Sequence, residues 1–405
     1  MHNKRPDLYV ALVAPTGTPL QGLRDELRAQ FASYGYEVCL IKISDLIASH
    51  YDLNTSALAE GERILRLMNE GDKLRRELKR GDAPALLAIS AIRVQRKKFG
   101  EEIPGTCGSR VFLIDSLKNP DEHKTLEQIY GRNLYTISVF AEQKVRIAKI
   151  ASRISASEST PLSNRHSDIA LSIIQEDQSR PGSDLSQNVR DTFPKADYFI
   201  SVDDSLKTQV GRFVDLAFGH PFISPNVHEY GMFLAKAASR RSADLSRQVG
   251  AAILSDTSAV ISTGCNEVPH AFGGFFFEGR EGAVDNRDHV HGHDPNFAEI
   301  QRTLEELLDT LNTNQMLKGR KRKKEEVSRL ASDLLFGNMK YTIEGLRIRS
   351  LIEFGRVVHA EMHAICEAAS AGRGIRGATM YCTTFPCHMC ARHIIAAGLS
   401  NPSYS

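Results

Sequence analysis

The sequence has no tryptophan, seven cysteines among 405 residues, and little excess charge. The formal net charge is +2 at pH 7, so composition alone does not indicate a nucleic-acid binder. A small, odd number of cysteines in so long a chain does not suit a disulfide framework; it favours a reducing compartment and a metal site. No apolar run approaches the ~20 residues of a membrane helix. We therefore expect no membrane partner and a cytoplasmic location.

The chain begins with MHNKRPDLYVALVAP, an apolar stretch that Pro15 interrupts and that has no small-residue cleavage pattern. We interpret it as a first strand rather than a signal peptide. Four more β-rich runs follow, separated by helical stretches. The five candidate strands are 8–15, 37–44, 110–117, 134–141 and 196–203. Strands that alternate with helices indicate βαβ units and a parallel sheet.

A domain boundary is expected near residues 220–226, where two prolines interrupt the pattern. The length predicts two or three domains. We therefore divide the chain into residues 1–222 and 223–405, the second with an insertion at 271–350. Within the second domain we expect strands at 248–256, 259–268 and 378–384, the first two antiparallel, and helices at 230–242, 357–372 and 387–398.

The strongest chemical signal is His359-Ala-Glu361, followed downstream by Pro386-Cys387-His-Met-Cys390. Cys387 and Cys390 are three residues apart, so they share one helix face, and the start of a helix favours thiolates. His359 offers an imidazole from a different helix. Three protein ligands leave one zinc position for water, whose pKa the metal lowers. Glu361 then has the chemistry of a proton shuttle.

An alternative is a closed structural zinc site, which needs a fourth protein ligand. His363 and His388 are the candidates, because one follows His359 by four residues and the other lies between the cysteines. A second alternative is that the two cysteines are ordinary core residues.

The combination H-x-E with P-C-x-x-C is the pattern of zinc deaminases. Residues 226–405 resemble the deoxycytidylate deaminase family of the cytidine deaminase fold, through residues 247–251 (RQVGA), residues 264–269 (GCNEVP) and the zinc motifs. The resemblance implies an α/β/α sandwich, a Zn²⁺ ion and a contact from Asn266 to the substrate sugar. A turn role is the alternative for Asn266.

The order of the whole chain resembles the bacterial anti-phage dCTP deaminases, in which a P-loop kinase-like domain precedes the deaminase. The segments VFLIDSLKNPDE, GRFVDLAFG, EYGMFLAKAASRRS and SRQVGAAI carry this likeness. It implies deamination of free deoxycytidine nucleotides, dCTP and as a second candidate dCMP, which would drain a pool that phage replication needs. A homo-oligomer and an inhibitory RNA or protein regulator are further expectations of the resemblance.

The first loop of the N-terminal domain, residues 14–19, follows a strand and precedes a helix, as a phosphate-binding loop would. It lacks the G-x-x-x-x-G-K-[ST] pattern and its lysine. Gly17 and Thr18 with the helix start could still cradle a phosphate, and Asp115 stands where a magnesium ligand of an NTP site would. The alternative is a sheet whose aspartate caps a loop. We expect a regulatory or sensing role rather than phosphotransfer.

Two other segments carry predictions. The family continues past the last helix, whereas this sequence stops at residues 398–405, and Pro402 argues against a central strand there. We therefore expect a sheet that lacks an edge, from a truncated product or one completed by a partner. The polar stretch 285–296 resembles the family's insertion, which implies that Arg287, Asp288 and Asp294 lie near nucleotide phosphates. A second metal site or a solvated loop are its alternatives.

Two rival functions remain open. A nucleic-acid cytidine or adenosine deaminase would need aromatic stacking platforms and basic grooves, and the lack of tryptophan counts against it. A catalytically silent sensor or interaction protein is the second rival.

Overall fold

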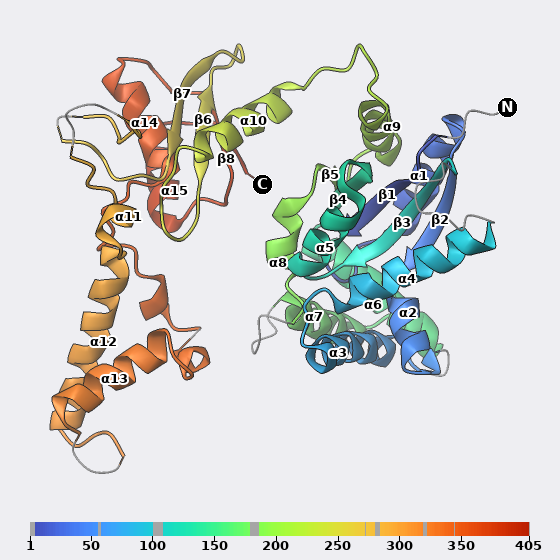
Figure 1. Cartoon of the computed structure of the whole chain (residues 1–405), viewed down its shortest axis with the longest axis horizontal. Helices are drawn as coiled ribbons and strands as arrows, with labels where there is room; N and C mark the ends of the chain where they lie inside the picture. Colours follow the sequence, from blue (N-terminus) through green and yellow to red (C-terminus); the bar gives the residue numbers. More distant parts are fainter. Residues whose placement is uncertain are drawn as a thin grey trace. The chain divides into compact units, whose positions relative to one another are not determined.

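The computed structural model describes residues 5–55, 58–99, 108–178, 186–271, 273–279, 284–318, 322–343 and 345–404. The chain divides into two compact units, Met1–Ile223 and Ser224–Ser405 (Figure 1). Among the described residues, no helix combines the length and apolar character that crossing a membrane requires. Residues 319–321, within the basic segment 318–324, lie outside the described residues.

The N-terminal unit is built on a five-stranded parallel sheet, which confirms the sequence prediction. Its strands are β1 (Leu8–Val13), β2 (Glu37–Lys42), β3 (Arg110–Leu117), β4 (Leu134–Phe140) and β5 (Tyr198–Ser201), in the order β2-β3-β1-β4-β5. The strand order reverses at β1, which lies between β3 and β4. In open α/β sheets, ligands bind beyond the carboxyl ends of the strands at such a switch point.

Helices cover both faces of this sheet. They are α1 (Gln21–Ser33), α2 (Ile43–His50), α3 (Glu60–Leu78), α4 (Ala83–Lys98), α5 (Pro120–Tyr130), α6 (Gln143–Glu158), α7 (Asn164–Gln178), α8 (Val189–Thr192) and α9 (Leu206–Ala217). Alternate residues of β1 serve the two faces: Val10 packs with α1 and α9, whereas Ala11 packs with α2, α4 and α5. Helices α3, α6 and α7 share a separate apolar cluster.

The C-terminal unit has three layers around a four-stranded sheet. The strands are β6 (Gly250–Leu254), β7 (Val260–Cys265), β8 (Thr379–Cys382) and β9 (Asn401–Tyr404), in the order β7-β6-β8-β9. β6 is antiparallel to β7 and to β8, and β9 is parallel to β8. Ala251 and Ile253 of β6 face α14 (Ala360–Ser370) and α15 (His388–Ala396), whereas Ala252 and Leu254 face α10 (Val227–Ser239).

The expectation of a missing edge strand is wrong, because β9 forms an edge of this sheet. Pro402 lies within β9, in register with Met380 of β8. Proline is tolerated in an edge strand, since only a strand paired on both sides needs every backbone N–H. The argument from Pro402 against a central strand is confirmed, whereas the inference that no edge strand forms there is wrong.

The segment between β7 and α14 carries several helices in its described part. It contains α11 (Asp288–His291), α12 (Pro295–Thr313), α13 (Lys324–Leu335) and two short 3₁₀ turns, Lys340–Ile343 and Arg347–Ser350. α12 and α13 bury a small core of their own, to which Ile343 contributes. In the expected insertion at 271–350, the described residues before α12 include one short helix, α11.

Candidate functional site

Two helices of the C-terminal unit begin at residues with metal-ligand chemistry. His359 is the N-cap of α14, and Cys387 is the N-cap of α15. The Sγ atom of Cys387 accepts a hydrogen bond of 3.4 Å from the backbone N–H of Cys390. The first N–H groups of a helix have no intrahelical partner, and the dipole end there is positive, so the start of α15 stabilises negative sulfur.

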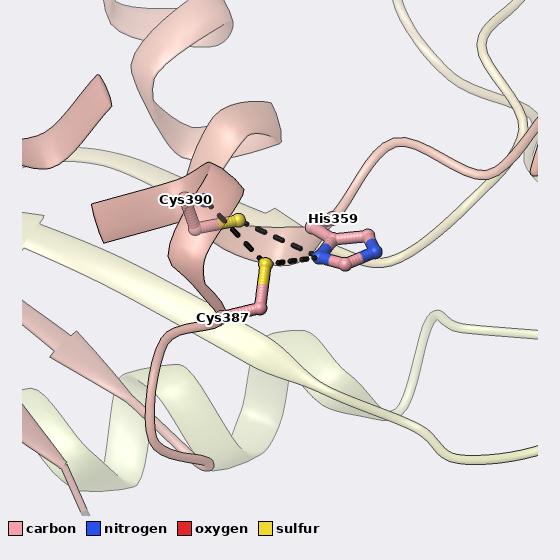
Figure 2. A group of neighbouring side chains, drawn as sticks. All are labelled: His359, Cys387 and Cys390. Carbon is pink, nitrogen blue, oxygen red and sulfur yellow. Dashed lines mark hydrogen bonds between the residues drawn. The ribbon is translucent and has the colours of Figure 1, made fainter. Parts of the chain in front are cut away.

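The side chains of His359, Cys387 and Cys390 converge on one point (Figure 2). Nδ1 of His359 lies 3.5 Å from the Sγ atoms of both cysteines. Zinc bonds of about 2.0 Å to nitrogen and 2.3 Å to sulfur, at a tetrahedral angle, separate these atoms by about 3.5 Å. The three ligand atoms therefore have the spacing that Zn²⁺ requires.

The electrostatics of the group also fit a cation. Burial raises the pKa of the Cys390 thiol, and the negative charges of Glu361 and Cys387 raise it further. Two thiolates and a carboxylate repel one another at this distance unless a positive charge joins them. A divalent ion supplies that charge.

Neither histidine that could have closed the zinc shell belongs to this group. Nδ1 of His363 lies 2.7 Å from the carbonyl oxygen of Cys265, and the ring is fully buried. His388 is exposed. Within the described residues the potential ligand set thus stops at three, which suits a site with one open position.

Glu361 lies in the first turn of α14, two residues after His359, and is 2% exposed. It lines a cavity of about 380 Å³ together with His359 and Cys387. The proposed proton shuttle and two of the three ligand residues therefore share one cavity.

A glycine allows α14 to approach the sheet closely. A Cβ atom at Gly264 of β7 would lie 2.4 Å from the carbonyl oxygen of Ala360 and 2.4 Å from the backbone nitrogen of Ala364. Both are backbone atoms, which cannot swing aside. Gly264 therefore sets how closely β7 packs against the helix that carries His359 and Glu361.

Asn266 lines the same cavity, where the family resemblance predicted a substrate contact. Its Nδ2 donates to the carbonyl oxygen of Arg247, and its Oδ1 accepts from the backbone N–H of Val249, both at 2.7 Å. The amide thus ties the end of β7 to the segment before β6. These hydrogen bonds give Asn266 a structural role, as did the alternative in which it serves a turn.

The three residues expected near phosphates lie in different settings. Arg287 forms a two-pronged ion pair with Asp285, at 3.0 and 2.7 Å, and is not among the residues that line the cavity. This pair holds the pKa of Asp285 down at about 2. Asp288 lines the cavity and accepts hydrogen bonds from Arg356. Asp294 also lines it, and caps α12 by accepting from the N–H of Asn296 at 2.8 Å.

Two arginines that were not among the predicted site residues, Arg247 and Arg349, also line this cavity. Arg247 donates to the hydroxyl of Thr384, and Arg349 donates to the carbonyl oxygen of Lys340. Neither pairs with a carboxylate in the described parts of the chain. Arg247 stood within the quoted RQVGA motif, whereas Arg349 comes from the insertion and had no local signal.

In the N-terminal unit, the three nucleotide-binding candidates Gly17, Thr18 and Asp115 make different contacts. Gly17, with φ of +89°, occupies a tight turn closed by a hydrogen bond from Thr18 N–H to the Pro15 oxygen. The Thr18 hydroxyl also donates to the Pro15 oxygen, at 2.7 Å. Asp115, at the end of β3, pairs with Arg24 at 3.4 Å. Burial raises the pKa of Asp115, and Arg24 counteracts this shift.

Comparison with known proteins shows that the C-terminal unit matches a known protein family. Residues 225–404 match the family model described as "Cytidine and deoxycytidylate deaminase zinc-binding region". A curated relative, the deoxycytidylate deaminase of Enterobacteria phage T2, is 47% identical over 47 residues. That stretch covers 12% of this chain and 25% of the relative, so the match spans a quarter of the phage protein's length.

Solved structures were also similar in part. A dCMP deaminase from the cyanophage S-TIM5 aligns with 18% identity over 45% of this chain and 84% of its own, with a TM-score of 0.23. A shikimate kinase from Acinetobacter baumannii aligns with 10% identity over 53% of this chain and 96% of its own, with a TM-score of 0.30.

Proposed function

We propose that the C-terminal unit catalyses zinc-dependent hydrolytic deamination of the cytosine base in a free deoxycytidine nucleotide. One observation carries the proposal: His359, Cys387 and Cys390 present three ligand atoms at zinc spacing, and buried Glu361 lines the same cavity. The family match over residues 225–404 supports the same chemistry.

Each residue has a distinct part in this reaction. His359, Cys387 and Cys390 hold the ion, which when bound supplies Lewis-acid activation of water. Glu361 accepts a proton from the attacking water and delivers it to N3 of the ring. It then assists transfer of a second proton to the departing amine. A C–O bond forms at C4 and the C4–N bond breaks, so one water is consumed and one ammonia is released.

The cavity also supports a nucleotide rather than a free base. Arg247 and Arg349 line it and have no carboxylate partner in the described residues, so they are available to phosphate oxygens. We propose dCTP as substrate, with dCMP as the second candidate. An Arg349→Met variant should then raise KM for dCTP more than for deoxycytidine.

The direct test incubates the zinc-loaded protein with dCTP, dCMP, deoxycytidine and a cytosine-containing single strand, and separates the products by chromatography. A Glu361→Gln variant is the negative control, and Glu367→Gln, a partly exposed position on the same helix, is the matched positive control. Conversion of a nucleotide that only Glu361→Gln abolishes supports the proposal. Conversion of the single strand alone would instead identify a nucleic-acid deaminase, and zinc-bound protein inert on every substrate would favour the silent sensor.

The biological role follows as a further proposal from the resemblance of the whole chain. Deamination of dCTP would lower the dCTP pool and so oppose phage replication. Cells that express the wild-type chain or Glu361→Gln can be infected in parallel while nucleotide pools are measured. Equal phage yields in the two would contradict this role. A homo-oligomer, an inhibitory RNA or protein regulator, and a cytoplasmic location belong to the same proposal.

A further inference from the structure

A second buried carboxylate faces the cavity that Glu361 lines. Asp288, the first residue of α11, is 6% exposed and belongs to the lining of this cavity. It comes from the insertion, whereas Glu361 comes from α14, so two parts of the chain that are distant in sequence supply carboxylates to one space. The proposed deamination uses Glu361 and gives Asp288 no part in the chemistry.

In the described parts of the chain, only one oxygen of Asp288 is engaged by the protein. Arg356 donates to Oδ1 from Nε, at 3.1 Å, and from Nη2, and its Nη2 also donates to the carbonyl oxygen of Asn286 at 2.8 Å. No donor among the described residues reaches Oδ2. Oδ2 is not one of the enclosed polar atoms either, so a molecule in the cavity can contact it. Arg356 therefore fixes the carboxylate and leaves one acceptor open.

The two other aspartates that line the cavity, Asp244 and Asp294, are less buried than Asp288. Each holds a local backbone turn: Oδ1 of Asp244 accepts from the N–H of Ser246, and Oδ1 of Asp294 accepts from the N–H of Asn296, both at 2.8 Å. Both side chains are half-buried, so water has more access to their second oxygens. The open oxygen of Asp288 has less access to water, and a buried polar atom without a hydrogen bond costs free energy. Asp288 therefore gains most from a donor on a ligand.

The chemistry of a deoxycytidine nucleotide limits what can meet this oxygen. A carboxylate repels phosphate oxygens and only accepts hydrogen bonds, so its partner must be a donor. Such a nucleotide has two kinds of donor near neutral pH, the amino group on C4 and the 3′-hydroxyl of the sugar. The amino group is displaced in the proposed reaction, so it must face Glu361 and the metal ligands. The 3′-hydroxyl is the donor that remains for Asp288.

We propose that Oδ2 of Asp288 accepts a hydrogen bond from the 3′-hydroxyl of the nucleotide, and that this contact restricts the cavity to free nucleotides. The inference rests on the proposed function and adds a specificity-determining residue to it. Within a nucleic-acid strand the 3′ oxygen is esterified, so it has no hydrogen to donate and brings a phosphodiester anion toward the carboxylate. Asp288 thus attracts a free nucleotide and repels an internal nucleotide of a strand.

The charges of the cavity wall agree with this assignment. Arg247 and Arg349 line the same cavity, and neither pairs with Asp288. The wall therefore offers separate groups to the two sides of the sugar: arginines for the 5′-phosphate and a carboxylate for the 3′-hydroxyl. A nucleotide with phosphate on both sides can satisfy the arginines but not Asp288.

The first test measures binding without turnover. The zinc-loaded full chain with Glu361→Gln is titrated calorimetrically with dCTP and with 2′,3′-dideoxycytidine triphosphate, which differs from dCTP only by the missing 3′-hydroxyl. We expect the dideoxy nucleotide to bind about tenfold more weakly, because a hydrogen bond to a charged acceptor is lost. Adding Asp288→Ala should remove this difference, whereas adding Asp309→Asn, at an exposed position of α12, should keep it. A missing preference, a preference that survives Asp288→Ala, or no binding of either nucleotide would overturn the proposal.

The repulsive part is tested with the same proteins and two other ligands. Deoxycytidine 3′,5′-bisphosphate carries the 3′-phosphate that an internal nucleotide of a strand would have, and dCMP lacks it. We expect the bisphosphate to bind more weakly than dCMP when Asp288 is present, and Asp288→Ala to narrow that gap about tenfold or more. A gap of the same size in both proteins would show that Asp288 does not exclude strands.

A third measurement needs no substitution at Asp288. The zinc-loaded wild-type chain receives dCTP and its dideoxy analogue in equal amounts, and the two deaminated products are separated by chromatography. We expect dCTP to be converted about tenfold faster. Equal conversion of the two would overturn this inference and leave the proposed function standing, whereas conversion of neither would contradict both.

Discussion

In the C-terminal unit, the ligand atoms of His359, Cys387 and Cys390 lie together with no cationic side chain among them. In the N-terminal unit, by contrast, buried carboxylates lie next to lysine or arginine side chains. Arg75, 1% exposed, shows the second arrangement most fully. It pairs with Asp72 at 3.0 Å and Glu122 at 2.6 Å, and donates to the Gly81 oxygen. The first arrangement calls for an ion from outside the chain. The second arrangement pairs the chain's buried charges with one another.

The largest expected effect comes from removing a zinc ligand. Cys390→Ser should lower zinc affinity by more than the roughly 10–100-fold that the loss of an outer partner costs, because a ligand atom itself is replaced. Zinc per chain after dialysis is the measurement. Cys366→Ser, an exposed cysteine on α14, is the control and should keep its zinc. Full zinc retention by Cys390→Ser would remove it from the ligand set.

The comparison of the two units also predicts that removing a buried charge from the N-terminal unit lowers the free energy of unfolding but does not change the deamination rate. Arg75→Met leaves two buried carboxylates without their partner, so we expect a loss of about 3–5 kcal/mol in the free energy of unfolding. Arg28→Met removes an exposed ion pair with Asp25 and should cost less than about 1 kcal/mol. Denaturant unfolding measures both, and deamination rates of the folded variants should match wild type. Similar losses for the two would show that burial of Arg75 does not matter.

His363 predicts a pH-dependent difference within the C-terminal unit. Burial lowers its pKa from 6.5 to about 4. Between these values the unfolded chain binds a proton that the folded chain excludes, so stability falls as pH drops from about 6.5 to 4, by at most about 3 kcal/mol. His363→Gln should flatten this part of the profile of unfolding free energy against pH. An unchanged slope would mean that another group causes the acid sensitivity.

The smallest predicted effect concerns the packing of α14. Gly264→Ala places a methyl group against backbone atoms of Ala360 and Ala364, so we expect a loss of about 1–3 kcal/mol and weaker zinc binding. Gly374→Ala, where an added Cβ meets no atom within 4 Å, is the matched control and should be near neutral. If both variants behave alike, close packing at Gly264 does not position the site.

The sequence predicted the parts of this molecule that local patterns determine. Alternating apolar runs indicated the strands, and two short motifs at helix starts indicated the three proposed zinc ligands. The Asp177–Lys118 pair could not be predicted, because the two residues come from separate elements that only tertiary packing brings together. Arg287 was predicted to lie near nucleotide phosphates, but it forms an ion pair with Asp285, two residues away. Pro402 was interpreted without knowing that its strand lies at an edge.

His359 and Cys387, whose ligand atoms meet, are separated by 28 positions in the chain, and α14 and β8 lie between them. A bound ion would therefore act as a cross-link that closes this loop and limits the conformations of the unfolded chain. A disulfide around a loop of about 15 residues contributes roughly 3 kcal/mol in the chain-entropy model. Unlike a disulfide, this cross-link can be withdrawn by a chelator without a reductant, so the ion would govern how the segment refolds as well as what it catalyses.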